Sequence, residues 1–364
     1  MQKHQKSNRK LIALGILASS VFLTPVIPLL TSFSKTASAS TTYLFPGRAE
    51  NLQSGEHWYK NKKNHGSANQ KLGSALTAAR FNESTKNSTN QDLDNHTLTA
   101  DKVVNLAELS GDKKEISRHG IPANNYQSIF NQITKSGYRL EWIDGFSVKG
   151  KIYYNLIFRP NNNKSWASFH KLTSSQYQDK FNKYTGKGFK PTQVESYRQG
   201  NKTFYAAIFV KENGAKTTTY HGISQEKHQE RFNQLTQDGY QPKNISVVSI
   251  NGQRRYTALY EKNNVGSFVA KSFLTPTEYQ RLSNLNRRSG RQIAYLNAYV
   301  HKGKPRFTAI WNSNTKGLFI ARHGLSSNGY QQNWENAIKS GFLTRNVTGY
   351  ANGNSVRYAG VWRE

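Results

Sequence analysis

Aromatic and aliphatic residues alternate along a short segment that recurs through the C-terminal two thirds of the chain. In its first copy, Tyr154, Leu156 and Phe158 fall on one side of a strand and Ile157 falls on the other. Later copies keep this order of large and small residues. Because apolar residues occupy both sides, both faces of the strand must be covered. The pattern therefore predicts the central strand of a small sheet.

A short helix is predicted ahead of each central strand. Tyr126, Phe130 and Ile133 have the i, i+4, i+7 spacing of a buried helical face. A Ser or Thr is expected to cap the start of each helix, and Pro122 takes this place in the first unit. The expected caps are Thr173, Ser224, Thr275 and Ser326. A glycine is expected to end each helix, at Gly137, Gly188, Gly239, Gly290 and Gly341.

Two strand-like runs follow each glycine, such as residues 138–147 and 151–158, and a Gly or Asn between them predicts a hairpin. A third strand is expected to run into the next unit, as at residues 319–322. The array begins with such a strand at 115–118 and ends just after a central strand. We therefore expect the first strand to complete the sheet of the last unit.

The units repeat every 51 residues without an insertion. One column of residues marks their starting points, at His119, His170, His221, Ser272 and His323. We predict an α+β repeat protein with five units over residues 112–364. Each unit has one helix and a three-stranded antiparallel sheet, and the units close into a propeller-like ring. An open solenoid is the alternative.

The histidine column has two interpretations. A histidine that closes a strand ahead of a helix commonly serves as a structural hydrogen-bonding residue. Residues related by the rotation of a ring can instead converge on its axis and bind a metal or an anion. Ser272 interrupts the column, so we take the histidines and the helix-ending glycines as structural markers of the repeat.

The N-terminal third has a different character. Residues 1–39 combine a basic start, an apolar stretch from Leu11 to Leu30 and the small residues Ala37-Ser38-Ala39, which is typical of a cleaved export signal. An uncleaved anchor is the alternative, and both place the remainder outside the cell. Residues 40–111 are polar, and their pattern predicts no particular fold. We therefore expect a secreted or cell-surface protein.

The cysteine content limits the chemistry of the chain, and its charge limits the classes of partner. The chain has no cysteine, which excludes disulfides and cysteine nucleophiles. Lys and Arg total 51 against 21 Asp and Glu, and five of the basic residues lie within 1–39, which leaves +25 (46 minus 21) for the rest. Such a charge favours an anionic polymer, namely a cell-wall glycopolymer, a polysaccharide or a nucleic acid, over neutral ligands. An extracellular protein is the other candidate partner, and no motif calls for a cofactor or metal. The candidate binding residues are Arg254, Arg255, Arg287, Arg288, Arg291, Lys302, Lys304 and Arg306.

Three motifs of the units carry a family resemblance: His221-Gly222-Ile223, Gly239-Tyr240 and the strand from Tyr205 to Phe209. They resemble the bacterial tandem repeat family found in the N-terminal part of fungal polyglycine hydrolases and beside beta-lactamase-like serine hydrolase domains. In those relatives the chemistry resides in the attached hydrolase. The resemblance therefore implies a targeting or accessory role, with a hydrolase as a possible associate. Since this chain ends at Glu364, we expect no hydrolase domain of its own.

A hydrolytic role is the alternative function. Ser and Lys occur at S-x-x-K spacing at Ser110/Lys113, Ser168/Lys171 and Ser224/Lys227, but the companion elements of serine acylation are missing. Residues 58–76 resemble the metal-binding start of lysostaphin-type zinc peptidases, with Thr77 where a ligand aspartate is expected. We therefore expect a secreted binding or targeting module, against an accessory or diverged member of a secreted serine hydrolase or zinc peptidase family.

Overall fold

The computed structural model describes residues 114–364, so the predicted export signal, the region 40–111 and the peptidase-like segment lie outside the described residues. The first repeat runs in the order β1 (Ile116–Pro122), α3 (Tyr126–Lys135), β2 (Tyr138–Val148) and β3 (Lys151–Pro160). Its three strands form an antiparallel sheet in the order β1-β3-β2. The strand that the aromatic pattern predicts to be central is therefore central.

The other four repeats have the same order of elements and the same strand order. Their elements are β4 (Trp166–Leu172), α4 (Ser174–Thr185), β5 (Lys190–Gln199) and β6 (Lys202–Val210); β7 (Thr217–Ile223), α5 (Gln225–Gln237), β8 (Gln241–Ile250) and β9 (Gln253–Glu261); β10 (Phe268–Leu274), α6 (Pro276–Arg288), β11 (Gln292–His301) and β12 (Lys304–Asn312); and β13 (Phe319–Leu325), α7 (Ser327–Lys339), β14 (Leu343–Asn352) and β15 (Ser355–Arg363). The predicted composition of each unit, one helix and a three-stranded antiparallel sheet, is confirmed.

The strand that precedes each helix belongs to a different sheet from the one the sequence suggested. Ile116 of β1 lies opposite Phe158 of β3, within the first repeat. Likewise, Phe319 of β13 lies opposite Arg363 of β15 in the fifth repeat. The prediction that the first strand completes the last sheet is wrong. A periodic sequence does not say where a unit begins, whereas strand pairing does.

The first helix also begins differently from the prediction. Thr173, Ser224, Thr275 and Ser326 cap the other four helices, each accepting a hydrogen bond from a backbone N–H of the first turn. Pro122 instead ends β1, and α3 begins after Asn125 without a side-chain cap. Proline offers no side-chain acceptor, and the turn of residues 123–125 separates the strand from the helix.

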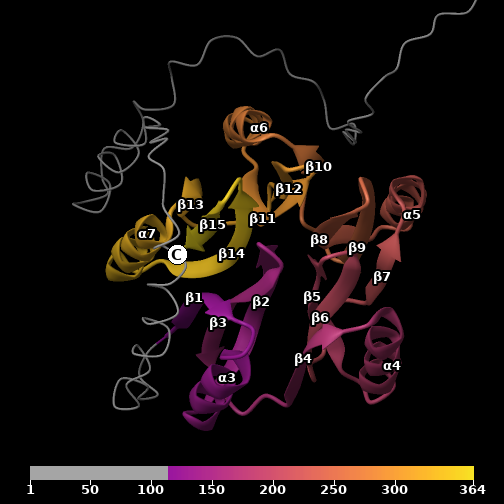
Figure 1. The fold of residues 1–364 in the computed structure, drawn as a ribbon. Coiled ribbons are helices and arrows are strands. Elements are labelled where there is room, and N and C mark those ends of the chain that lie inside the picture. The colour runs from indigo at the N-terminus through magenta and orange to yellow at the C-terminus, as the bar shows by residue number, and fades with distance from the viewer. Residues whose placement is uncertain (1–113) are drawn as a thin grey trace, which may run out of the picture. The chain divides into compact units, whose positions relative to one another are not determined.

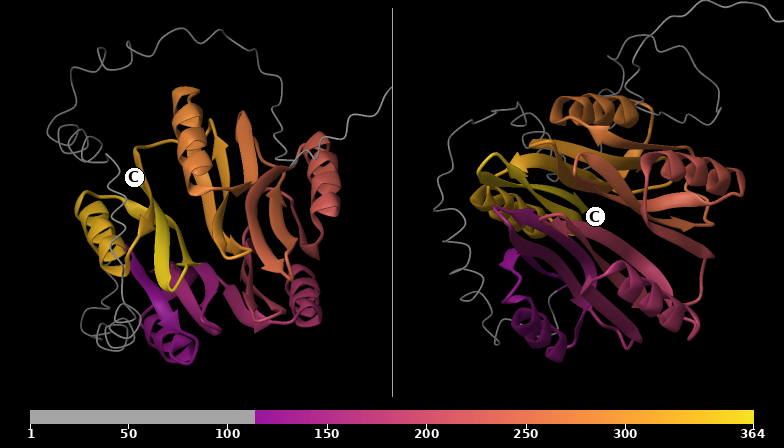
Figure 2. Two further views of the ribbon diagram at one scale, coloured as in Figure 1. Left: turned by 45° about the horizontal axis from the view of Figure 1, so that its top comes forward. Right: turned by 45° about the vertical axis from the view of Figure 1, so that its right-hand side comes forward.

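The five sheets are arranged in a circuit, and the strand that follows the helix in each repeat is the innermost (Figure 1). Strands β2, β5, β8, β11 and β14 pack side by side in this order, and β14 packs back against β2. The helices lie on the outside of this circuit in each view (Figure 2). The first and fifth repeats are therefore direct neighbours. Within residues 114–364, no helix has the length and apolar character needed to cross a membrane.

Candidate functional site

The histidine column lies between neighbouring repeats. His170, from the second repeat, packs on the rings of Tyr126 and Tyr154 of the first, at centroid distances of 3.8 and 5.4 Å. His221 packs in the same way on the second repeat, and its Nε2 lies 2.9 Å from Oγ of Ser174. Burial, assisted by the charge of Lys171, lowers the pKa of His170 to about 4. The imidazole is therefore neutral at physiological pH and serves as a packing and hydrogen-bonding group.

His119 makes the same contacts across the junction of the first and fifth repeats. Its ring lies 4.6 Å from that of Tyr330 and 5.0 Å from that of Tyr358, and its Nε2 lies 3.0 Å from Oγ of Ser327. Each histidine of the column thus occupies a separate interface. The junction between the two ends of the array uses the same side-chain contacts as its internal junctions.

At the interface between the third and fourth repeats, the histidine comes from the helix of the third repeat and not from the histidine column. Ser272 replaces the histidine of the fourth repeat, and His228 replaces the helical tyrosine of the third. His228 stacks on Tyr256 with ring centroids 4.1 Å apart. The hydroxyl oxygen of Tyr256 lies 3.3 Å from Oγ of Ser272. An imidazole ring is therefore retained in the interface, but the opposite side supplies it.

The residue after Ser272 is the centre of a cationic group. Phe273 has a φ of 67°, where Gly120, Gly222 and Gly324 stand in three of the other repeats. The guanidinium of Arg254 lies 4.0 Å from the ring centroid of Phe273, and that of Arg306 lies 4.9 Å from it. These distances are typical of cation–π contacts. Arginines from two repeats therefore both contact this aromatic ring.

Further basic residues surround this ring. His301 stands edge-on to Phe273 at 5.0 Å, and its pKa is lowered by burial and by the charges of Arg254, Lys302 and Arg306. The pKa of Glu226 is lowered mainly by hydrogen bonds from its own backbone N–H and from Ser224, and the charges of Arg254 and Arg255 lower it further. The basic residues of this group lie at or next to the hairpin turns of the third and fourth repeats. We call Arg254, Arg255, Lys302, Lys304 and Arg306 the cationic hairpin cluster.

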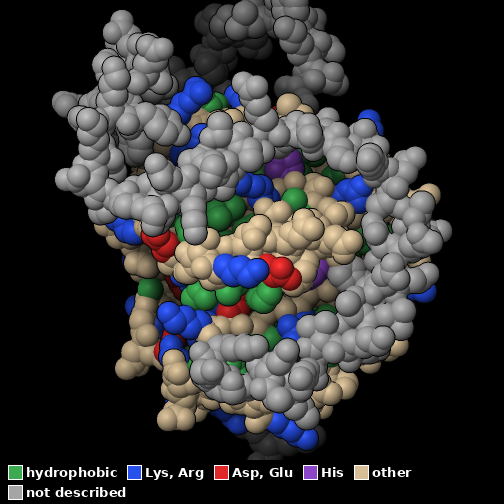
Figure 3. Space-filling view, turned by 90° about the vertical axis from the view of Figure 1, so that its left-hand side faces the viewer, with side chains coloured by type: hydrophobic (Ala, Val, Ile, Leu, Met, Phe, Trp, Pro, Cys, Tyr) green, Lys and Arg blue, Asp and Glu red, His purple; other side chains and the backbone are tan. Residues whose placement is uncertain are grey.

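The structure divides the predicted binding residues into two groups. Arg287, Arg288 and Arg291 lie at the end of α6, whereas the cationic hairpin cluster lies near its start, where Phe307 pairs with Leu274. Arg287 and Arg288 are exposed, and Nε of Arg291 donates to Oδ1 of Asn286 at 2.7 Å. Basic side chains are also spread over the side of the molecule seen in Figure 3. The distinctive property of the hairpin cluster is therefore its organisation around Phe273.

A second group of polar residues meets at the centre of the circuit, and the sequence analysis missed it. Each innermost strand contributes one member at an interval of 51 residues: Asp144, Glu195, Ser246, Asn297 and Thr348. All five are buried. Nδ2 of Asn297, in the fourth repeat, lies 3.4 Å from Oε1 of Glu195, in the second, so side chains of non-adjacent repeats meet here. We call these residues the axial cluster.

Hydrogen bonds tie the axial cluster to neighbouring strands. Oδ2 of Asp144 accepts bonds from the backbone N–H of Gly349, at 2.9 Å, and from Nδ2 of Asn155, at 2.8 Å. Oε1 of Glu195 accepts from Oγ of Ser246 at 2.7 Å. Burial raises the pKa of Asp144 to about 7, and burial and the nearby charge of Asp144 raise that of Glu195. Two acidic groups therefore share a site shielded from water.

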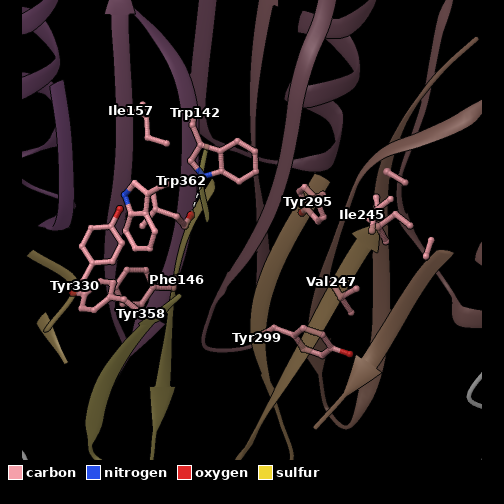
Figure 4. Close-up of a cluster of buried hydrophobic side chains, with 14 of the residues drawn as sticks. Trp142, Phe146, Ile157, Ile245, Val247, Tyr295, Tyr299, Tyr330, Tyr358 and Trp362 are labelled. Atoms are coloured by element: carbon pink, nitrogen blue, oxygen red, sulfur yellow. Dashed lines mark hydrogen bonds between the residues drawn. The ribbon is translucent and has the colours of Figure 1, made fainter. Parts of the chain in front are cut away.

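An aromatic pair lies beside this cluster. Trp142 and Tyr295, from the first and fourth repeats, have ring centroids 5.9 Å apart (Figure 4). The charges of Glu195 and Asp144 contribute to the raised pKa of Tyr295, after burial. Nε1 of Trp142 donates to the backbone oxygen of Val347 in the fifth repeat at 2.8 Å. The rings therefore pack close to the carboxyl groups and take part in the contacts between repeats.

The two S-x-x-K serines within the described residues, Ser168 and Ser224, make structural contacts. Ser224 of the S-x-x-K pattern caps α5 by accepting a bond from the backbone N–H of Lys227. Ser168 interacts with the hydroxyl of Tyr126, and Ser110 lies outside the described residues. Residues 114–364 also contain no group of three or more His, Cys, Asp and Glu side chains able to hold a metal ion.

Comparison with known proteins agrees with the repeat boundaries set by strand pairing. A family model described as polyglycine hydrolase-like, structural repeat, matches at residues 114–161, 163–212, 214–263, 266–314 and 316–364. Each match contains one complete unit of strand, helix and hairpin. No curated protein matches the chain.

Proposed function

The chain belongs to the polyglycine hydrolase-like structural repeat family, and from this premise we propose that its repeats form a secreted binding module for an anionic glycopolymer. The observation that carries the proposal is the cationic hairpin cluster, in which Arg254 and Arg306 both contact the ring of Phe273. The export signal predicted at residues 1–39 supports the extracellular location.

The arrangement suits a polymer that carries phosphate or carboxylate groups. Guanidinium groups bind such anions through paired hydrogen bonds, and stacking on an aromatic ring fixes their orientation before the ligand arrives. Lys302 and Lys304 are exposed at the adjacent hairpin turn, where they add attraction over a longer range. A chain of repeated anionic groups can contact all of these residues together.

Binding of the purified chain to lipoteichoic acid, an acidic polysaccharide and a neutral glucan tests the proposal. We expect retention on the two anionic polymers to fall between 50 and 300 mM salt, on the order of tenfold or more, because salt screens exposed charges. The neutral glucan should bind weakly at every salt concentration.

Paired variants locate the binding surface. Replacing both Arg254 and Arg306 with Ala should weaken binding by about tenfold, since the two contacts together are worth somewhat more than 1 kcal/mol. The matched control replaces Arg287 and Arg288, which removes the same charge from the end of α6 and should change affinity by less than about twofold. Equal losses in both variants would show that net charge alone drives binding. Release of cleavage products would instead favour the hydrolase alternative.

A further inference from the structure

The axial cluster contains two acidic groups without a basic partner. Asp144 and Glu195 are each 1% exposed, and the ion pairs found among residues 114–364 involve neither of them. The other three members, Ser246, Asn297 and Thr348, present hydroxyl or amide groups. Burying carboxylates without a compensating charge is costly, so such a group requires neutralisation.

Two oxygen atoms at the centre are also left without partners. Oε2 of Glu195 and Oδ1 of Asn297 are buried, and neither has a hydrogen-bond partner within the described part of the chain. The two side chains face each other across the circuit, since Nδ2 of Asn297 lies 3.4 Å from Oε1 of Glu195. Buried acceptors of this kind are usually satisfied by a donor, a water molecule or a cation.

We propose that the axial cluster is a binding site for one hard divalent cation of the calcium type, held by oxygen atoms from several repeats. The carboxylates of Asp144 and Glu195 supply two negative charges, which match a divalent ion. Oδ1 of Asn297 and the hydroxyl oxygens of Ser246 and Thr348 are the neutral ligands in reach of the same centre.

The type of ion follows from the ligands. Calcium takes six to eight oxygen ligands and accepts carboxylate, amide and hydroxyl oxygens in irregular geometry. Zinc and copper sites favour imidazole or thiolate ligands, and neither group is present in the axial cluster. The set of five side chains therefore favours calcium, with backbone oxygens or water completing the shell.

The location gives the ion a structural role. Because the ligands come from five repeats, the ion stabilises only the state in which the innermost strands are assembled around it. The site is buried on all sides, so we expect an ion captured during folding to exchange slowly with solvent. Calcium binding in this site would therefore stabilise the circuit independently of any polymer bound at the hairpin cluster.

The test uses the full chain unfolded in chelator and refolded with and without calcium. We expect about one calcium per chain by elemental analysis and a melting temperature about 5 to 10 °C higher with saturating calcium. Terbium added during refolding should show luminescence sensitised by Trp142 and Tyr295, whose rings lie beside the cluster. Calcium should suppress that signal by competition.

Variants assign the effect to this site. Glu195→Gln keeps the shape of the side chain but removes one charge, and it should abolish the terbium signal and the calcium-dependent rise in melting temperature. Glu226→Gln, an exposed carboxylate on α5, is the matched control and should retain both. Refolded parent protein with no bound ion, no terbium signal and an unchanged melting temperature would overturn the proposal. The same measurements on the parent decide the matter even when Glu195→Gln fails to fold.

Discussion

Nε1 of Trp142 donates a hydrogen bond of 2.8 Å to the backbone oxygen of Val347, 205 residues further along the chain. The equivalent positions of the second and third repeats make equivalent bonds. Nδ2 of Asn244 donates to the backbone oxygen of Val194 at 2.7 Å, and Gln193 donates in the same way to Ile143. In these three repeats, the side chain at this position thus binds the innermost strand of the preceding repeat. The first repeat therefore contacts the fifth in the same way as the second and third repeats contact the repeat before them.

Removing the indole N–H should therefore weaken the junction of the two ends. Trp142→Phe leaves the buried oxygen of Val347 without its donor, and we expect the free energy of unfolding to fall by about 1 to 3 kcal/mol. Urea denaturation followed by fluorescence or circular dichroism measures the change. Trp166→Phe, at a half-buried tryptophan of the second repeat, controls for loss of ring size. A similar cost for both substitutions would mean that the hydrogen bond adds nothing.

Gly349 provides a second test of the same junction. A Cβ added there would lie 2.4 Å from Cε1 of Phe146, in the first repeat. We expect Gly349→Ala to lower the free energy of unfolding by about 1 to 3 kcal/mol, because the ring must move within a packed core. Combining it with Phe146→Ala removes the clash, so the two costs should sum to more than the cost of the double variant. Strictly additive costs would contradict the contact.

The buried histidines should make stability depend on pH. Burial lowers the pKa of His170 and His323 to about 4 and that of His228 to about 3, whereas an unfolded histidine titrates near about 6.5. As pH falls from about 6.5 to about 4, the unfolded chain takes up protons that the folded chain does not, so the free energy of unfolding falls. In the chain without a bound cation, the raised pKa of Asp144 acts in the opposite sense throughout this range.

Comparison of His170→Gln with the parent at each pH isolates one histidine from these opposing groups. The tyrosines packed on His170, Tyr126 and Tyr154, stay neutral throughout, because burial raises the pKa of both. The variant should be less stable at pH 7.5 because it loses the ring contacts. The difference in the free energy of unfolding should shrink toward pH 4.5, because only the parent loses stability by keeping residue 170 uncharged. A difference that is constant with pH would show that His170 is protonated in the folded chain.

The sequence predicts the parts of each repeat well because regular packing leaves a regular pattern. Tyr154, Leu156 and Phe158 mark a strand covered on both faces, and Thr275, a predicted cap, forms a capping box with Glu278. The assignment of β1 to the last sheet failed because periodicity fixes the spacing of strands without fixing which strands pair. All five sheets have the same strand order, which the spacing of the pattern does not encode.

The axial cluster was missed because its members share a position and not a residue type. The columns recognised in the sequence repeat the same side chain, whereas this one contains Asp144, Glu195, Ser246, Asn297 and Thr348. A usable signal was present, since each is a polar residue at the same place in the strand after the helix-ending glycine, at intervals of 51 residues. The hairpin cluster was found only in part, because the role of Phe273 depends on contacts between strands of two repeats.

Phe273 offers a way to separate binding from stability. Its φ of 67° lies in the region that favours glycine, and Gly222 and Gly324 occupy the same position at 65° and 71°. Phe273→Gly relieves backbone strain of about 1 to 2 kcal/mol but loses the packing of a half-buried ring, worth about as much. We therefore expect the free energy of unfolding to change by less than about 2 kcal/mol. Affinity for lipoteichoic acid should nevertheless fall about threefold or more, since Arg254 and Arg306 lose the ring that orients them.

The matched control is Lys171→Gly, which makes the same backbone change at the equivalent position of the second repeat. It removes one positive charge but no aromatic platform, so binding should change by less than about twofold. Measuring both variants over a salt series tells orientation from charge. Loss of the platform should weaken binding at every salt concentration and leave the salt dependence nearly unchanged, because the arginines remain. Unchanged affinity in Phe273→Gly would mean that the arginines bind without the ring, and the cluster would then act through charge alone.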